Sequence, residues 1–184
     1  MRSGRSGISW SSLLRDMALF IDKARLIAEI TPGNEHLPQP SFMDLAFDEA
    51  RAARAAGEVP VGCVIVRGSD IIARADNRTR RDRDPTAHAE MLAIRTAAAA
   101  LGSERLVDCD LYVTLEPCAM CAAAISFARI RRLYFGAGDP KGGAVEHGVR
   151  FFAAATCHHR PEVYGGIGEQ EAASLLRAFF AERR

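Results

Sequence analysis

From Ser41 onward, stretches with helical and strand-like patterns alternate along the chain, and this alternation limits the possible folds more than any other feature. The pattern predicts a helix, two strands, a helix, a strand, a helix, two strands and a closing helix. A hairpin followed by alternating elements is typical of an α/β layer structure, in which helices cover both faces of a mixed, largely parallel sheet. The 184 residues suffice for one such domain with a short appendage.

Local signals place the individual elements. A capping-box pattern from Ser41 to Asp44 predicts a helix start, and Gly57 is the expected stop. Pro85 is expected in the first turn of a second helix that runs to about Ala100, because proline fits that position. The other predicted elements are strands at 62–66, 70–75, 111–115, 132–135 and 162–164 and helices at 118–129 and 169–182.

Residues 1–40 differ in texture from the rest, because Arg-Ser-Gly repeats open them and proline-rich stretches close them. A weak helical pattern lies between, at steps of three and four, formed by Leu14, Met17, Ile21, Ala24 and Ala28. We expect an N-terminal extension here, either flexible or a short helix. An upstream start codon is the alternative, with Met43 as the next candidate start.

Composition places the chain among ordinary globular proteins, with 48% hydrophobic and 26% charged residues. The net charge of +1 neither requires nor excludes a polyanionic partner. The longest uncharged apolar run, Cys118 to Ala128, is too short to span a bilayer, so no membrane partner is expected. Five cysteines and no secretory signal argue against a disulfide framework and for a reducing compartment, which we take to be the cytoplasm.

Two short motifs can carry chemistry, His88-Ala89-Glu90 and Pro117-Cys118-Ala119-Met120-Cys121. Each opens a predicted helix after a loop or strand end, which is where open α/β sheets bind ligands. Cys118 and Cys121 are three residues apart, so on a helix both sulfurs can reach one ion, and His88 can supply a nitrogen. Such a Cys₂His set leaves one position of a tetrahedral Zn²⁺ open to water, as is typical of catalytic sites.

Glu90 is predicted to be the catalytic residue rather than a fourth ligand. Two side chains that are two residues apart on a helix lie about 200° apart around its axis. In the first turn, however, the side chains of His88 and Glu90 tilt toward the N-terminus and can reach one site beyond it. A carboxylate beside zinc-activated water can carry protons in both directions. A His-x-Glu motif followed by Pro-Cys-x-x-Cys is the signature of the zinc deaminases.

Further stretches extend the similarity well beyond the metal motif. They are Gly57–Gly62, Asn77–Thr79, Pro85–Met91, Leu111–Cys121, Asp139–Lys141 and Phe179–Phe180. Through them, the chain from Phe42 to Arg184 resembles the bacterial tRNA-specific adenosine deaminases of the cytidine-deaminase-like superfamily. The resemblance implies a three-layer α/β/α fold with a five-stranded mixed sheet, a zinc-dependent deaminase domain over residues 41–184, and a homodimer with one Zn²⁺ per subunit.

The resemblance also implies a reaction, the hydrolytic conversion of adenosine to inosine at the wobble position of tRNA anticodons. Its partner would be the tRNA anticodon loop. By the same comparison, His88, Cys118 and Cys121 would hold the zinc. Glu90 would move a proton from water to the purine N1 and then to the leaving amine.

Three more residues correspond to substrate-binding positions of that family. Asn77 matches an asparagine that hydrogen-bonds the flipped purine, and its alternative is a loop residue that caps its own backbone. Asp139 and Lys141 lie in the segment that contacts the anticodon-loop backbone, where a carboxylate can accept from a ribose 2′-OH. A turn at Gly138-Asp139-Pro140 is the alternative for this segment, and both roles can hold together.

Two other functions stay open from the sequence. One is deamination of a free nucleobase or nucleoside, such as guanine, cytosine or cytidine, and the other is a zinc-stabilised binding module without turnover. The chain departs from many relatives over Gly142–Phe152, and no contact is assigned there. Cys157-His158-His159 is expected to be structural, because adjacent ligands rarely bind one ion. The arginine-rich loop at 78–83 fits RNA binding or a solvated, salt-bridged loop equally well.

Overall fold

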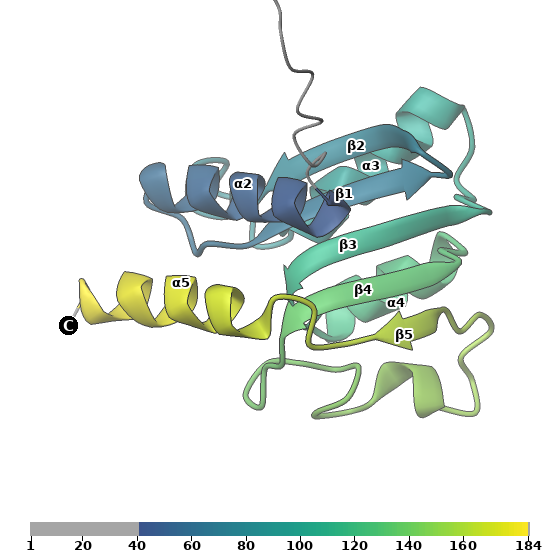
Figure 1. Ribbon diagram of the computed structural model, residues 1–184. Helices are drawn as coiled ribbons and strands as arrows, with labels where there is room; N and C mark the ends of the chain where they lie inside the picture. The colour runs from purple at the N-terminus through teal and green to yellow at the C-terminus, as the bar shows by residue number, and fades with distance from the viewer. Residues whose placement is uncertain (1–40, 184) are drawn as a thin grey trace, which may run out of the picture. The chain divides into compact units, whose positions relative to one another are not determined.

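A five-stranded sheet with helices on both faces forms the fold (Figure 1). This computed structural model describes residues 41–183, so the extension predicted at 1–40 lies outside the described residues. The elements are α2 (Phe42–Ala55), β1 (Gly62–Arg67), β2 (Asp70–Asp76), α3 (Ala89–Leu101), β3 (Cys109–Leu115), α4 (Ala119–Phe127), β4 (Arg132–Ala137), the short 3-10 helix η1 (Phe151–Ala153), β5 (Glu162–Tyr164) and α5 (Glu169–Ala181). Across this part of the chain, no helix has the length and apolar character needed to cross a bilayer.

The strand order is β2-β1-β3-β4-β5. β1 pairs antiparallel with both β2 and β3, whereas β3–β4 and β4–β5 are parallel. The predicted mixed sheet is confirmed, but "largely parallel" overstates it, because only two of its four pairings are parallel. The hairpin explains the difference: it reverses the chain before α3, so β3 returns beside β1 in the opposite direction.

Side chains of the strands alternate between two cores, as the period of a β-strand requires. Ile65 and Leu111 belong to the core that α3 and α4 cover, while their neighbours Val64 and Val66 face the core under α2 and α5. Figure 1 shows the same division, with α2 and α5 on the near face of the sheet and α3 and α4 on the far face. The three predicted layers are therefore present.

Helices α2 and α3 differ in how well their starts follow the signals in the sequence. α2 begins as predicted, because Ser41 and Asp44 form both bonds of a capping box. The predicted start of α3 at Pro85 is wrong, since the helix begins at Ala89. The Asp84 carboxylate accepts hydrogen bonds from the backbone N–H and hydroxyl of Thr86, both at 2.7 Å, and this turn competes with a helical first turn.

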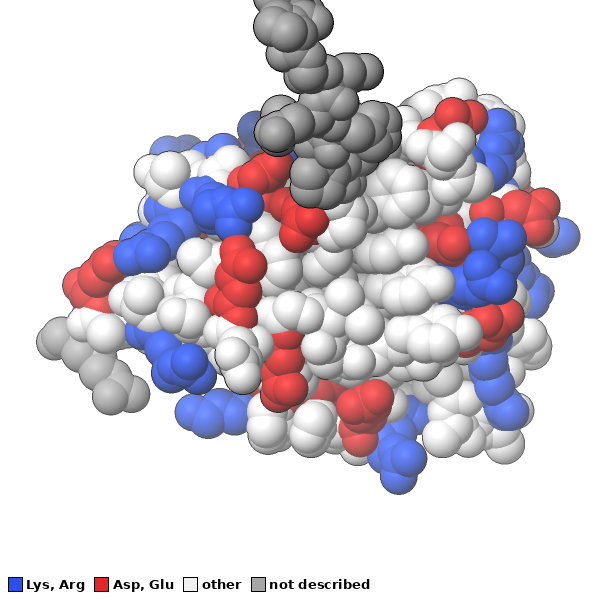
Figure 2. All heavy atoms as spheres, viewed as in Figure 1, with Lys and Arg blue, Asp and Glu red and all other residues white. Residues whose placement is uncertain are grey.

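Three tyrosines stack along the near face of the sheet beside the helices. The ring centroids of Tyr112 and Tyr134 are 4.4 Å apart, and those of Tyr134 and Tyr164 are 4.9 Å apart. Phe42 of α2 continues the row on Tyr112. Figure 2 shows charged side chains over α2, α5 and the strand ends, with uncharged side chains over the middle of this face.

Helix α2 lies directly on β1 at Gly62. A Cβ atom added there would lie 2.1 Å from the carbonyl oxygen of Ala46 and 2.5 Å from the backbone nitrogen of Ala50. Contacts this short cannot be relieved by a side-chain rotation, because both neighbours are backbone atoms. The absence of a side chain at Gly62 therefore sets the distance between the helix and the sheet.

We expect Gly62→Ala to lower the free energy of unfolding by about 3 kcal/mol, because the helix must move away from the strand. Gly102→Ala is the control. Gly102 has φ 62° and open space around the position, so only backbone strain of about 1 kcal/mol is added there. Urea unfolding of both variants measures the difference. A loss at residue 62 no larger than that at residue 102 would contradict the close packing of α2.

Candidate metal centre and active site

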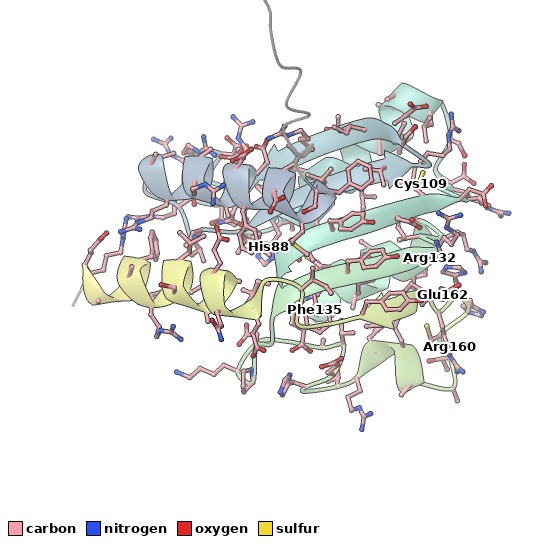
Figure 3. All side chains as sticks on the ribbon, viewed as in Figure 1. His88, Cys109, Arg132, Phe135, Arg160 and Glu162 are labelled. Atoms are coloured by element: carbon pink, nitrogen blue, oxygen red, sulfur yellow. The ribbon has the colours of Figure 1, made fainter. Side chains whose placement is uncertain are left out.

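Two predicted metal ligands occupy the positions just before the two helices on the far face of the sheet. His88 is the N-cap of α3 and Cys118 is the N-cap of α4, and both have extended backbone conformations. Neither side chain caps its helix by a hydrogen bond. Both are instead free to point to a common site, and Figure 3 shows His88 near the end of the sheet where β3 finishes.

The donor atoms of His88, Cys118 and Cys121 lie within 4.8 Å of one another, and no other such group was found among residues 41–183. The His88 Nδ1 is 3.7 Å from the Cys118 Sγ and 3.6 Å from the Cys121 Sγ. A tetrahedral zinc ion at about 2.0 Å from nitrogen and about 2.3 Å from sulfur places N and S about 3.6 Å apart. The donor set and its spacing therefore fit zinc.

The local electrostatics favour a cation at these donors. A hydrogen bond from the Cys121 thiol lowers the pKa of Cys118 to about 4 against the effect of burial, and His88 adds to this lowering. The same bond, together with burial, raises the pKa of Cys121. The hydrogen bond with Cys118 raises the pKa of His88. One thiolate is thus already favoured, beside the partial positive charge of the α4 N-terminus.

Glu90 lies in the first turn of α3, as the end-on geometry predicts, and only 4% of it is exposed. Burial raises its pKa above the ordinary value of 4.5. A raised pKa makes a carboxyl group better able to hold a proton and donate it, as a proton shuttle must. Glu90 shares one cavity of about 270 Å³ with His88 and Cys118.

The same cavity contains two of the three predicted substrate-binding residues. Asn77 and Asp139 both line it, on walls that come from different parts of the chain. Lys141 does not reach this cavity and lies on the neighbouring surface. Cys121 is fully buried behind it.

Asn77 is fixed by a residue that the sequence analysis missed. Its side-chain nitrogen donates to the Glu58 carboxylate and to the Thr79 hydroxyl, each at 3.4 Å. Glu58 is fully buried and also accepts from the backbone N–H of Arg80 and Arg81 at 3.0 and 2.7 Å. This carboxylate therefore orders the loop that carries Asn77. A charged residue within the apolar run Gly57–Val61 was the available sequence signal.

The opposite wall has a second buried carboxylate, Glu116, which sequence reasoning also missed. It accepts backbone hydrogen bonds from Asp139, Val145, Glu146 and His147 at 2.8–3.0 Å, and one from the His147 Nδ1 at 2.6 Å. Although burial alone would raise it, these bonds, led by that from the His147 backbone, lower the pKa of Glu116 to about 2. Asp139 in turn accepts from the backbone N–H of Lys141 and Gly142, so the predicted turn is present.

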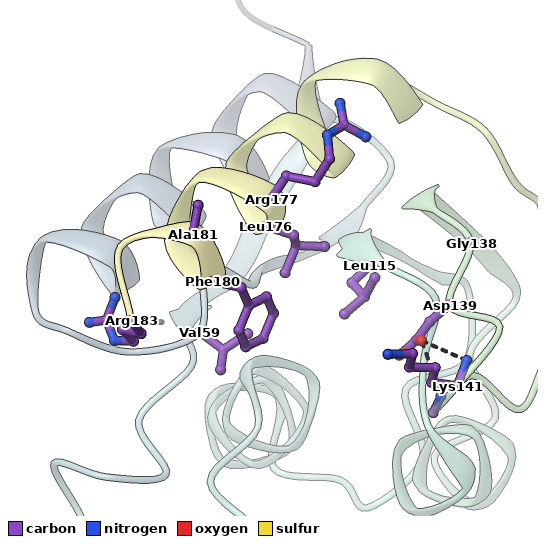
Figure 4. A pocket seen from close by; sticks show the side chains of 11 residues that line it. Val59, Leu115, Gly138, Asp139, Lys141, Leu176, Arg177, Phe180, Ala181 and Arg183 are labelled. Carbon is purple, nitrogen blue, oxygen red and sulfur yellow. Dashed lines mark hydrogen bonds between the residues drawn. The ribbon is translucent and has the colours of Figure 1, made fainter.

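A groove of about 860 Å³ adjoins the cavity (Figure 4). Leu176, Phe180 and Arg183, on α5 or just after it, form one side, and the turn with Asp139 and Lys141 forms the other. The groove and the cavity are continuous, because they share four lining residues. These are Val59, Leu115, Asp139 and Gly142.

The remaining predicted features make contacts within the protein. The Cys157 thiol donates to the His159 carbonyl oxygen at 3.0 Å, and the His159 Nε2 bonds the Ile130 carbonyl oxygen at 2.6 Å. In the arginine-rich loop, Arg81 forms an ion pair with Asp76, as a salt-bridged loop would. Cys157, His159 and Arg81 do not line the cavity, whereas Thr79 of the arginine-rich loop does.

Comparison with known proteins places this site in a family. Residues 38–137 match the family described as the cytidine and deoxycytidylate deaminase zinc-binding region. The tRNA-specific adenosine deaminase of Agrobacterium fabrum is 64% identical over 143 residues, which cover 78% of this chain and 94% of the relative. That of Bacillus subtilis is 45% identical, with coverages of 78% and 89%. The chain therefore belongs to the zinc-binding deaminases and, within them, to the tRNA-specific adenosine deaminase family.

Solved structures agree with this placement. A tRNA:A34 deaminase, studied for A-to-I editing at the wobble position of transfer RNA, is 64% identical and superposes with a TM-score of 0.72. The alignment covers 73% of this chain and 98% of that structure. Guanine deaminase from Nitrosomonas europaea is 25% identical with a TM-score of 0.66, and the coverages are 76% and 83%. The five-stranded deaminase fold is thereby confirmed.

The low pKa of Glu116 predicts a loss of stability in acid. A carboxyl group with a pKa lowered from 4.5 to about 2 stabilises the folded state by about 3 kcal/mol above pH 4.5, and this contribution disappears as the pH falls toward 2. We therefore expect wild type to exceed Glu116→Gln in stability near pH 7, with a difference that shrinks below pH 4.5. Chemical denaturation across this pH range measures it. A difference that does not change with pH would refute the explanation.

Proposed function

We propose that this protein is a zinc-dependent hydrolase that converts adenosine to inosine at the wobble position of tRNA anticodons. It would act in the cytoplasm as a homodimer with one zinc ion per subunit. The observation that carries the proposal is the convergence of His88, Cys118 and Cys121 with Glu90 in one cavity, in a chain 64% identical to a tRNA-specific adenosine deaminase. Five free cysteines support a reducing compartment.

In this proposal His88, Cys118 and Cys121 hold the zinc. The ion, when bound, acts as a Lewis acid that makes water a nucleophile near neutral pH. The nearby N-termini of α3 and α4 favour negative charge at the same place. The protein's own contribution is to fix three ligands and leave one direction open to the cavity.

Glu90 carries the protons of the reaction. It takes a proton from water as the oxygen adds to C6 of the purine, and it gives this proton to N1. It then moves the remaining hydroxyl proton to the amino group, the C6–N6 bond breaks, and ammonia leaves. The balance is adenosine and water in, inosine and ammonia out. Burial keeps this carboxyl group away from bulk water, which suits a shuttle that must both accept and donate.

The walls of the cavity hold the base. The volume of about 270 Å³ suits a single base rotated out of an RNA loop. The side chain of Asn77, held by Glu58, offers hydrogen-bonding groups to the purine, and Asp139 offers an acceptor at the edge where a ribose would lie. Lys141, Arg177 and Arg183 along the groove can pair with backbone phosphates of the flanking nucleotides.

Deamination of a free base is the second candidate, since a guanine deaminase has the same fold at 25% identity. The continuous groove favours the polynucleotide, because a free base would fill the cavity and leave the groove unused. The deciding experiment incubates zinc-loaded protein with an anticodon stem-loop that carries a wobble adenosine, and separately with guanine, cytosine, cytidine and adenosine. We expect inosine in the RNA. Turnover of a free base or nucleoside with none on RNA would reject the proposal.

Glu90→Gln tests the role of the carboxylate directly. We expect the rate of inosine formation to fall by at least about a thousandfold, because general acid–base catalysis and proton delivery are both lost. Zinc content and thermal stability should stay close to wild type, since Glu90 is not a ligand. Glu104→Gln, at an exposed position, is the matched control. A variant that retains wild-type ammonia release would show that another group moves the proton.

A further inference from the structure

A single buried carboxylate, that of Glu116, organises the segment 139–147. Only 2% of Glu116 is exposed, and each of its oxygens accepts hydrogen bonds from the segment 139–147. Four of the five donors are backbone N–H groups, which any sequence could supply. The fifth is the imidazole of His147, whose Nδ1 donates at 2.6 Å. Of the donors from this segment, His147 is therefore the one that bonds Glu116 through its side chain.

The segment is also attached to the metal-binding helix. The backbone N–H of Ala144 donates to the Pro117 carbonyl oxygen at 2.9 Å, and Gly143 forms an isolated antiparallel bridge with Cys118. A Cβ atom at Gly143 would lie 2.5 Å from the Glu116 carboxyl carbon. The segment therefore packs against Glu116 with no space left between them.

What the segment presents explains why its position matters. Asp139 and Gly142 line both the cavity and the groove, and Lys141 lines the groove alone. Figure 4 shows Asp139 and Lys141 together, across the groove from α5, with dashed lines for the bonds that the Asp139 carboxylate accepts. A shift of this turn would move one wall of the cavity and one wall of the groove at once. Glu90 and Cys121 lie in α3 and α4 and His88 is the N-cap of α3, so of these four residues only Cys118 is bonded to the segment, through its backbone bridge with Gly143.

We propose that Glu116 and His147 are positioning residues that hold the turn at 139–142, and so align the polynucleotide groove with the catalytic cavity; this rests on the proposed function. Glu116 lines the cavity, but both of its carboxylate oxygens accept hydrogen bonds from the segment, and His147 lines neither the cavity nor the groove. Their effect reaches the substrate through the backbone of the turn. Loss of the His147 imidazole leaves four backbone bonds to Glu116, so the segment loosens without unfolding.

The prediction separates binding from chemistry. His147→Ala should raise KM for an anticodon stem-loop about threefold to tenfold, which corresponds to the net contribution of one ordinary hydrogen bond. We expect kcat and zinc content to stay within about twofold of wild type. Amide hydrogen exchange of residues 139–147 should become faster in the free protein.

Two further variants and a double-mutant cycle between Glu116 and His147 complete the experiment. His147→Asn retains a side-chain nitrogen donor at about the position of Nδ1 and should restore KM, while His158→Ala, at an exposed position, is the control. In a Glu116→Gln background, His147→Ala should have little further effect, because the two residues act as one unit. Its readouts are KM, kcat and exchange.

The outcomes are distinct. Wild-type protein that makes no inosine from the stem-loop would end the proposed function itself. Active wild type with an unchanged KM in His147→Ala would end the positioning role alone. Loss of kcat or zinc with KM unchanged, or a failure of His147→Asn to restore KM, would also overturn it. A raised KM that asparagine restores, with faster exchange confined to the segment, supports it.

Discussion

The candidate active site depends on two helix N-termini whose N-cap positions hold candidate metal donors instead of capping side chains. A helix start normally gains stability when its N-cap side chain accepts a backbone N–H bond, worth about 1 kcal/mol. His88 and Cys118 occupy those positions and make no such bond. The helices are held instead by packing: Ala89, Ala93 and Ala97 of α3 are fully buried against the sheet, and their small size allows close contact. Packing against the sheet thus stabilises α3 and α4, whose N-termini are left uncapped by the candidate metal donors.

Two buried carboxylates extend the same principle to the walls of the cavity. Glu58 orders the loop with Asn77, and Glu116 orders the turn with Asp139, each mostly through backbone N–H groups. An ionised carboxylate without partners would be costly to bury, so each one requires its loop to close around it. The irregular segments on both sides of the cavity are in this way each fixed by bonds to a buried carboxylate.

The sequence was sufficient for what depends on local pattern and on motif. Strand and helix positions, the capping box at Ser41 and the convergence of His88 with Cys118 all follow from spacing and side-chain direction. It was insufficient where backbone atoms decide. The start of α3 was misplaced because the Asp84 turn competes with a helix. Glu116 was overlooked because four of its five partners are main-chain groups, which no residue pattern encodes.

Helix α5 is synthesised after the candidate metal donors, and this order affects how the site can assemble. Leu176, Phe180 and Arg183 form one side of the groove, and they follow the candidate metal donors in the sequence, so they leave the ribosome after them. The donors of the metal centre, from His88 to Cys121, emerge more than fifty residues earlier. A nascent chain can therefore bring the candidate metal donors together while the adjoining groove still lacks one side. The groove, in contrast, gains its second side only once α5 has emerged.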